Sequence, residues 1–394
     1  MRSIGTVSMG VRAPIVKKGD DLAQIVVDSI ASAVEHDGVV IKDHDVIGVT
    51  EAVLARTQGN YATTDQIAKD VKNKFDGEVV GLILPILSRN RFSMLLKGIA
   101  KGVKKLVIQL SYPSDEVGNP LISLDRLDEK GIDPYVDVLT EKEFRDLFGH
   151  NPHPFTGVDY IDYYKQLAGE FCECEVILAN NPKAILKYTD QVIVASIHSR
   201  FRTKKILLAN GASKVFGLDE ILTESVDGSG FHPQYGLLGS NLATEDSVKL
   251  FPRDAQPFVE RVQKLMVERF GKLVEVMVYG DGAFKDPVGG IWELADPVVS
   301  PGYTKGLEGQ PNELKLKYLA DNALKDLEGE EAKEAMIKLI KEKEDNLVNN
   351  IVSQGTTPRR LTDLLGSLCD LTSGSGDKGT PFILIQGYFD NYAS

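Results

Sequence analysis

Hydrophobic and polar positions along the chain alternate between short β-branched runs and longer amphipathic stretches. Apolar residues recur at helical spacing over 20–34, and Asp20 and Asp21 favour a helix start there. Similar periodicity predicts helices over 254–270 and 358–371. Apolar runs predict buried strands at 45–50, 79–87, 105–110, 175–179, 192–197, 274–279 and 382–386. Strands that alternate with helices predict a mixed α/β (α+β) fold.

Two stretches interrupt this pattern. Residues 111–156 are rich in Pro, Gly and Asp with weak periodicity, so we expect a surface insertion rather than a core element. Within 297–356, a charged segment with Glu and Lys at helical spacing predicts a solvated helical insertion. The remaining segments 1–110, 157–296 and 357–394 are expected to form the α/β core, as one unit or two intertwined subdomains.

Composition narrows the function classes. The chain has 394 residues, 42% of them hydrophobic, which exceeds what a small peptide-like binding module needs. Its net charge of −12 argues against broad nucleic-acid or bilayer binding, because each phosphate contact needs a local cation. Three cysteines make no disulfide framework, and no apolar run approaches the roughly 18 residues of a membrane span. We therefore expect a soluble cytoplasmic protein.

A glycine-rich loop near the end of the chain has the spacing G-x-G-x-x-G over residues 374–379. The dinucleotide fingerprint needs a strand before the glycines and a helix after them, whereas here the helix comes first. No Gly-Lys-Ser/Thr closes a phosphate-binding P-loop either. The loop can still offer backbone N–H groups to an anion, and a plain structural turn is the alternative.

Two polar turns hold candidate metal or ligand residues. Asp281 follows a buried strand, where it is either a hard-cation ligand or a turn residue beside Gly282. In the Gly-rich loop predicted over 225–245 and just beyond it, Asn241 could bind a ligand and Glu245 or Asp246 a metal. The alternative for this segment is a simple change of chain direction.

Other polar groups are weaker candidates. His150 and His153, like Cys172 and Cys174, lack the four-ligand spacing of a structural zinc site. The densest basic cluster marks either a pocket for an anionic substrate or a solvated helix face, and consists of Arg200, Arg202, Lys204 and Lys205.

The order of these motifs resembles the gamma-glutamyl ligases of the deazaflavin coenzyme F-420. The opening 11–22, with its Gly-Asp-Asp-Leu helix start, and the strand 45–51 that leads through Arg56 to Gly59 both match that family. Its central Gly-x-x-x-Ser-Asn element recurs as 236–241, and a turn similar to its Ser-Asp-Thr-Phe-Gly turn follows at 279–284. The closing Gly-x-Pro and apolar strand recur over 379–387.

This resemblance implies an activity and its partners. Family members use GTP and a divalent metal, Mg²⁺ or Mn²⁺, to add L-glutamate to a carboxylate acceptor through an acyl phosphate. It also implies the family's fold, here with two insertions, and a homodimer. The acceptor is a coenzyme F-420 precursor, with a folate-like or other anionic carboxylate as the alternative. No partner in this chemistry is a nucleic acid or a membrane.

The resemblance also implies site residues, and it assigns none of them a catalytic role. By position, the nucleotide-binding residues are Arg12, Ala13, Pro14, Ile15, Val16, Thr50, Glu51, Arg56, Asn241, Ser373, Gly374, Ser375, Gly376, Asp377, Lys378, Gly379 and Thr380. The metal-binding positions are Asp281, Gly282 and Ser375, with Asp246 as a further candidate.

The chain departs from the family pattern at its metal positions. Leu238 stands where the family has an aspartate, and Gly282 where it has a threonine. Side chains that could compensate are Glu245, Asp246, Asp286 and Asp227. A second hypothesis follows from these departures: a nucleotide-binding or regulatory homologue with weakened catalysis.

Overall fold

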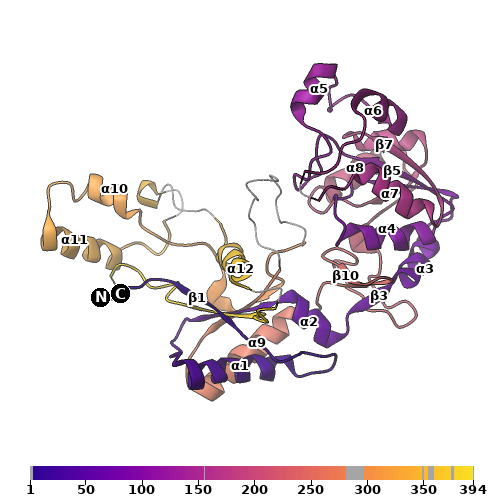
Figure 1. Cartoon of the computed structure of the whole chain (residues 1–394). Coiled ribbons are helices and arrows are strands. Elements are labelled where there is room, and N and C mark those ends of the chain that lie inside the picture. Colours follow the sequence, from indigo (N-terminus) through magenta and orange to yellow (C-terminus); the bar gives the residue numbers. More distant parts are fainter. Residues whose placement is uncertain are drawn as a thin grey trace.

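Three β-sheets organise the chain, and two of them collect strands from distant parts of the sequence. The computed structural model describes residues 3–154, 156–280, 297–347, 350–353, 359–373 and 377–393. Figure 1 shows one α/β body around the first sheet, a second around the largest sheet, and a helical projection at the opposite end. The predicted mixed α/β fold is confirmed.

The first sheet, sheet A, has the strand order β1-β14-β2-β12-β13. Its strands are β1 (Val7–Val11), β14 (Phe382–Gln386), β2 (Val46–Thr50), β12 (Glu275–Tyr279) and β13 (Gly302–Tyr303). β12 runs parallel to β2, whereas β14 is antiparallel to both of its neighbours. The C-terminal strand therefore lies between two strands from the first 50 residues.

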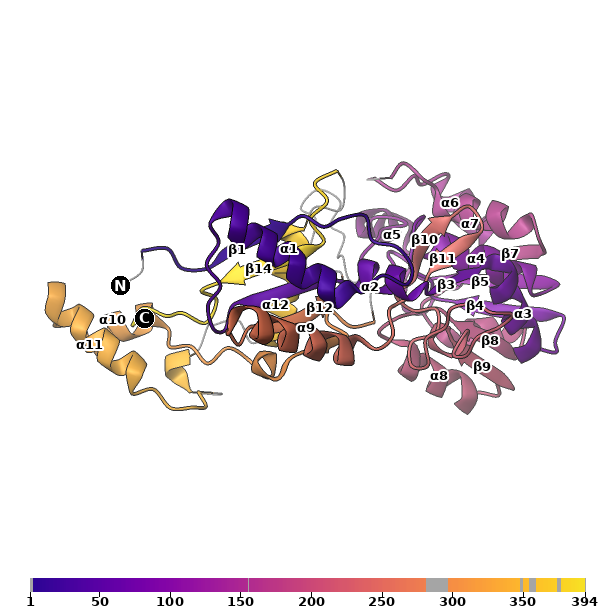
Figure 2. The same cartoon turned by 90° about the horizontal axis from the view of Figure 1, so that it is seen from below.

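Helices cover both faces of sheet A. One face packs against α1 (Leu22–Asp37) and α9 (Ala255–Phe270) through a cluster that includes Val26, Val259 and Ile47. The other face packs against α12 (Leu361–Thr372) through Leu365 and Cys369. Figure 2 shows α1 and α9 side by side across the sheet. The periodicity and the apolar runs located the three helices and the strands β2, β12 and β14 correctly to within three residues, whereas β1 and β13 were not predicted.

The largest sheet, sheet C, has the order β6-β7-β5-β4-β8-β9. Its strands are β6 (Leu139–Thr140), β7 (Glu173–Leu178), β5 (Lys105–Leu110), β4 (Val79–Ile83), β8 (Gln191–Val194) and β9 (Lys214–Gly217). All pairs are parallel except the edge pair of β6 with β7. The chain begins this sheet at its centre, adds β5 and β7 on one side, and then adds β8 and β9 on the other. This is a doubly wound arrangement whose strand order reverses between β4 and β8.

Helices also cover both faces of sheet C. On one face the buried cluster includes Ile67, Leu96 and Tyr164, and the other face packs against Leu207. The helices of this body are α3 (Thr64–Lys74), α4 (Phe92–Lys101), α5 (Leu124–Lys130), α6 (Glu141–Phe148), α7 (Tyr160–Gly169) and α8 (Arg200–Ala209).

A small antiparallel sheet lies where the chain passes between the two bodies. It consists of β10 (Asn241–Thr244), β11 (Ser247–Lys249) and β3 (Tyr61–Thr63), and β3 directly follows α2 (Glu51–Gln58). The prediction of a Gly-rich loop over 225–245 is therefore wrong for its last part, because residues 241–244 form β10. Short polar strands of this kind have no hydrophobic alternation to reveal them.

The two interrupting stretches fold differently from each other. Residues 111–156 form α5, β6 and α6, and their Tyr112, Phe144 and Phe148 join the core of sheet C instead of running only over the surface. The charged stretch forms α10 (Leu316–Asp321) and α11 (Gly329–Lys341), which share a small apolar cluster of their own. These two helices form the projection in Figure 1.

The close packing of α12 on sheet A predicts that one methyl group added at Gly48 destabilises the protein. A Cβ at Gly48 would overlap the sulfur of Cys369 and lie 3.2 Å from the Tyr279 ring. We expect Gly48→Ala to lower the free energy of unfolding by about 1–3 kcal/mol, measured by urea denaturation. The control is Gly169→Ala, because nothing lies within 4 Å of a Cβ there. Equal stability of the two variants would contradict the prediction.

Candidate functional site

The register of sheet A brings four chain segments to one edge. Val11 pairs with Phe382, which pairs with Val49, and Thr50 pairs with Tyr279. The chain leaves β1, β2 and β12 and enters β14 at this same end, so the segments beside them converge. Two backbone hydrogen bonds join them: the Ala13 N–H donates to Gly379 O at 3.1 Å, and the Thr50 N–H donates to Pro381 O at 3.1 Å.

A groove of about 630 Å³ opens between this edge and α1. Arg12, Lys378 and Thr380 line it together with Ser29 and Ser32 of α1. Both cationic side chains are exposed, and neither forms an ion pair with a residue that the structure describes. Asp37 of α1 adds one carboxylate to the lining. The groove therefore presents two positive charges, one negative charge and several hydroxyls, and its net positive charge favours an anionic ligand.

Gly10 keeps the strand and the loop close together at this groove. A Cβ at Gly10 would lie 2.9 Å from the Cβ of Thr380, closer than side-chain atoms normally approach. The segment 12–16 is tied down at its far end as well, where Arg56 Nε donates to Val16 O at 2.7 Å. Within this segment, Val16 is buried and Ile15 is 84% exposed, so the side chain of Ile15 is available to a ligand or a partner.

A buried ion pair lies next to this edge, at the start of α2. Lys249 Nζ is 2.7 Å from Glu51 Oε1, and the two side chains are only 10% and 6% exposed. Lys249 is the cross-strand partner of Asn241 in the β10–β11 pair. The pair thus brings the predicted Glu51 and Asn241 into one neighbourhood, although 190 positions separate them in sequence. The sequence analysis missed Lys249, which no motif marked.

Tyr279 is a second residue that the sequence analysis assigned no role. It ends β12, directly before Gly280, and is 1% exposed. Its hydroxyl has no hydrogen-bond partner among the described residues. Burial raises the pKa of Tyr279, and the nearby Ser373 and Thr50 offset that rise only in part. Tyr279 packs with Cys369 on the α12 face of sheet A, opposite the face that carries the groove, so its buried hydroxyl lies outside the groove.

Most of the predicted metal positions lie outside the described residues. These are Asp281, Gly282 and Ser375, and the same holds for the neighbouring Gly374 and Gly376.

Asp246 is described, and the structure does not bring it to the other predicted residues. It lies in the turn between β10 and β11, at the opposite end of this hairpin from Asn241. Its carboxylate is 2.5 Å from Lys97 Nζ, and that hydrogen bond holds the pKa of Asp246 below its ordinary value. The other candidate carboxylate, Asp227, is paired with Lys69 at 2.6 Å.

Leu238 is a core residue of the sheet C body. It is 2% exposed and belongs to the same cluster as Ile86 and Phe92. A carboxylate there would be buried among apolar side chains, which is costly without a charged partner. The apolar surroundings of position 238 therefore suit the leucine found here better than the aspartate of the family pattern.

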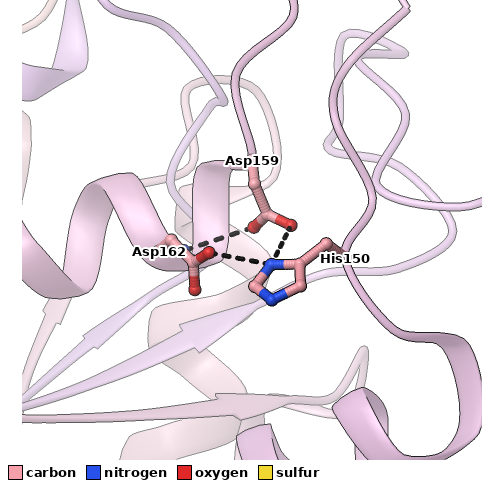
Figure 3. Close-up of side chains that lie close together, drawn as sticks. All are labelled: His150, Asp159 and Asp162. Atoms are coloured by element: carbon pink, nitrogen blue, oxygen red, sulfur yellow. Dashed lines mark hydrogen bonds and ion pairs between the residues drawn. The ribbon is translucent and has the colours of Figure 1, made fainter.

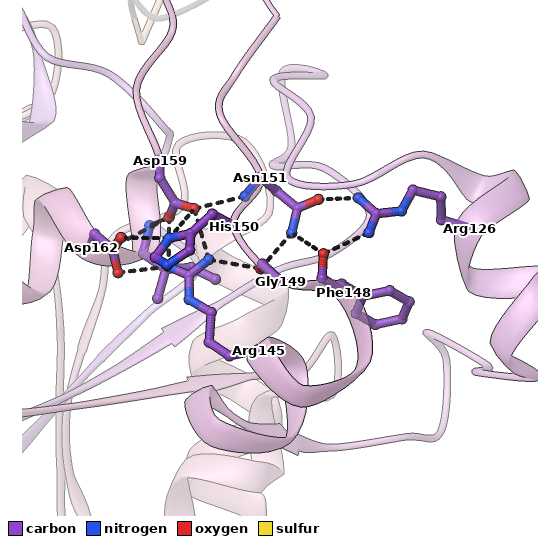
Figure 4. A network of polar contacts seen from close by, with 9 residues as sticks. Arg126, Arg145, Phe148, Gly149, His150, Asn151, Asp159 and Asp162 are labelled. Atoms are coloured by element: carbon purple, nitrogen blue, oxygen red, sulfur yellow. Dashed lines mark hydrogen bonds and ion pairs between the residues drawn. The ribbon is translucent and has the colours of Figure 1, made fainter.

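One group of three possible metal ligands exists among the described residues, and it lies elsewhere. His150, Asp159 and Asp162 converge beside the start of α7 (Figure 3). Arg145 reaches both carboxylates, at 2.7 and 2.8 Å to Asp159 and 2.7 Å to Asp162 (Figure 4). Asp159 also caps α7 by accepting from the Ile161 N–H. The guanidinium supplies the positive charge of this cluster, so we interpret it as a structural network.

The groove cations and the loop that closes over a sheet edge are features of a protein that binds a small anionic molecule. The chain belongs to the F420-0:gamma-glutamyl ligase family, whose model matches residues 10–387. This confirms the resemblance inferred from the motifs. None of the individually curated proteins matches the chain significantly. Among the described helices, none is long and apolar enough to cross a membrane.

The buried ion pair predicts a large loss of stability when one partner is removed. Lys249→Met leaves the Glu51 carboxylate buried without its ammonium partner, and we expect it to lower the free energy of unfolding by about 3–5 kcal/mol. The double variant Glu51→Gln/Lys249→Met should recover most of this loss, because it removes both charges. Urea denaturation measures all three proteins. A loss below about 1 kcal/mol in the single variant would show that the pair is not effectively buried.

The Arg145 network predicts a pH dependence. Burial alone would raise the pKa of Asp159, but hydrogen bonds from Arg145 and the Asn151 and Asp162 amides hold it below its ordinary value. Its stabilisation is therefore present above the unfolded-state pKa of about 3.9 and is lost as the pH falls through the lower folded-state pKa. We expect Asp159→Asn to cost stability at pH 6 and progressively less at acidic pH. Urea denaturation across pH, with the exposed Asp128→Asn as control, measures this difference. A cost that grows on acidification would contradict the assignment.

Proposed function

We propose that the chain is a GTP- and metal-dependent gamma-glutamyl ligase that joins L-glutamate to the carboxylate of F420-0 or a similar acceptor. Family membership supports the ligase class. The observation that supports the location of the site is the convergence of the Arg12 segment, the 377–380 loop and Thr50 at one edge of sheet A. The proposal includes a cytoplasmic homodimer, for which the resemblance to the family is the only support.

The nucleotide phosphates would bind where positive charge and backbone donors converge. Arg12, Lys378 and Thr380 line the groove, and backbone N–H groups of the loop 377–380 would add donors beside them. Asn241 and Glu51 lie at the adjoining end of β10 and α2, where they would contact the rest of the nucleotide.

The chemistry consists of two displacements. The acceptor carboxylate attacks the γ-phosphorus of GTP, forming an acyl phosphate and releasing GDP. The amino group of glutamate then attacks the acyl carbon, phosphate leaves, and the nitrogen gives up a proton as the amide forms. A divalent cation at this edge would neutralise charge on the transferred phosphoryl group. Asp281 is the ligand we propose for it, because it follows β12 two residues after Tyr279.

The buried Leu238 favours a second candidate function. It removes one carboxylate that the family pattern expects near Asn241, so a nucleotide-binding homologue with weakened catalysis is the alternative. The two candidates differ in turnover and not in binding. A ligase that uses a folate-like acceptor would instead differ only in its substrate.

Two measurements test this proposal. Thermal shift with GTP, ATP and GDP, each with and without Mn²⁺ or Mg²⁺, should show a metal-dependent rise in melting temperature with GTP, because a ligand of the native state stabilises it. GDP release with F420-0 and glutamate should follow, and Asp281→Asn should lower its rate by about 100-fold or more.

Asp246→Asn is the matched control for that variant. It makes the same chemical change, and its carboxylate lies at the far end of the hairpin on Lys97, so we expect turnover within about twofold of the wild type. Nucleotide binding without turnover would favour the weakened homologue. Turnover that survives Asp281→Asn would show that Asp281 is not the metal ligand.

A further inference from the structure

The carboxyl edge of sheet C has features that the ligase site does not use. The strand order reverses between β4 and β8, and doubly wound sheets bind ligands in the crevice outside this reversal point. β8 leads into α8, whose first turn therefore lies at the crevice. Figure 1 shows α8 and β5 in the body remote from α1 and α12, so this edge is separate from the groove in sheet A.

Three buried polar atoms without hydrogen-bond partners gather at this edge. They are Gln109 Oε1, Ser196 Oγ and Asp219 Oδ1, on residues that are 0%, 0% and 9% exposed. Gln109 is the next-to-last residue of β5, and its Nε2 donates to Ala179 O and Asn181 O beyond β7. Ser196 and Asp219 lie two residues beyond β8 and β9. Half of the unpartnered buried side-chain atoms found among the described residues thus lie at the ends of three parallel strands.

Strand alternation directs all three side chains to the same face as α8. Val194 packs with Leu207 of α8, and Gln109 shares the row of Val194 across β4. Ala195 and Ile197 pack on the opposite face, so Ser196 between them points toward the α8 side. Asp219 lies there too, since its Oδ2 is 2.9 Å from Nε of Arg200, the first residue of α8.

The N-terminus of α8 already holds a carboxylate. Glu116 accepts hydrogen bonds from the N–H groups of Ile197, His198 and Ser199, and from the Ser199 hydroxyl. The last three contacts are 3.2 to 3.3 Å long, at the upper end of the hydrogen-bond range. Backbone donors at a helix start are a general binding site for phosphate and other anions. Glu116 therefore stands where an anionic ligand group would bind.

Glu116 reaches this position from a loop with an anchor of its own. The buried Asp115 accepts the Leu87 N–H at 2.7 Å, just beyond β4, and also the Val117 and Asn119 N–H groups. The loop 114–120 thus joins the β4 side of the crevice to the β8 side. Because Asp115 holds the loop, Glu116 can leave α8 or be replaced without loss of that anchor.

We propose that this crevice is a second binding site, for a small phosphate monoester that carries hydroxyl groups, and that Glu116 occupies its anion position in the ligand-free protein. The phosphate oxygens would accept the four donors that Glu116 now engages, with Arg200 adjacent. Ser196 directly precedes Ile197, and its buried unpartnered hydroxyl would form a hydrogen bond with a hydroxyl of the ligand, because it can donate or accept. The inference does not rest on the proposed ligase function.

The test compares phosphate binding by the full-length wild type and Glu116→Ala. Inorganic phosphate is titrated at constant ionic strength, with chloride as the balancing anion, and followed by calorimetry and by amide NMR. We expect the dissociation constant to be about tenfold lower in the variant, because the competing carboxylate is gone. The amide signals of Ile197, His198 and Ser199 should move on titration. Glu129→Ala is the matched control, since it makes the same chemical change at an exposed residue of α5 and should bind as the wild type does.

A second arm tests the ligand class. Ribose 5-phosphate should bind Glu116→Ala more tightly than inorganic phosphate, and Ser196→Val in that background should remove the difference. Equal phosphate affinity in the wild type and Glu116→Ala, or amide signals at 197–199 that do not respond, would overturn the proposal. If Glu116→Ala does not fold, Glu116→Gln removes the charge with less disturbance, and the same outcomes apply. A lack of preference for ribose 5-phosphate would overturn the assigned class.

Discussion

The site in sheet A depends on one constraint, the insertion of β14 between β1 and β2. This strand is antiparallel to both neighbours, and its register places Phe382 between Val11 and Val49. The segments that precede or follow these three positions must then meet at the same edge. A glycine loop near the C-terminus is thereby held against a loop that ends 16 residues from the N-terminus. Without this pairing, the predicted nucleotide-binding residues would belong to unconnected parts of the chain.

A second constraint joins the two bodies. Glu51 belongs to the start of α2 beside sheet A, whereas Lys249 ends β11 in the small sheet that leads to sheet C. A buried pair of opposite charges is tolerated only when both partners stay in place, because either charge alone is strongly disfavoured. The orientation of Asn241 relative to Thr50 is therefore fixed by electrostatics as well as by packing. Two units that meet beside the proposed nucleotide site would gain from such a fixed contact.

Sequence patterns predicted the buried elements far better than their arrangement. The apolar runs of β2, β12 and β14 were located because strands covered on both faces are hydrophobic throughout. Their order in the sheet is non-local and has no signal in a single sequence. The core role of Phe144 was missed because its apolar neighbours are widely spaced in a Pro- and Asp-rich stretch. Lys249 was missed for a different reason. In the sequence it is an ordinary lysine of a short strand, and only tertiary packing buries its charged group.

In the sheet C body, two charged side chains occupy positions where an ion or a charged group of a ligand could otherwise bind. At Asp159 and Asp162 a guanidinium occupies the centre of a ligand set that would suit a cation, and it is held by several short contacts. At α8 a carboxylate occupies a position that suits an anion, but three of its four contacts are 3.2 to 3.3 Å long and its side chain is exposed. A replacement group that stabilises the fold should be buried and tightly bonded, as Arg145 is. Glu116 is exposed and three of its four contacts are long, while the buried hydroxyl of Ser196, one residue before Ile197, remains unpartnered. That contrast separates a structural network from a site that is kept for a ligand.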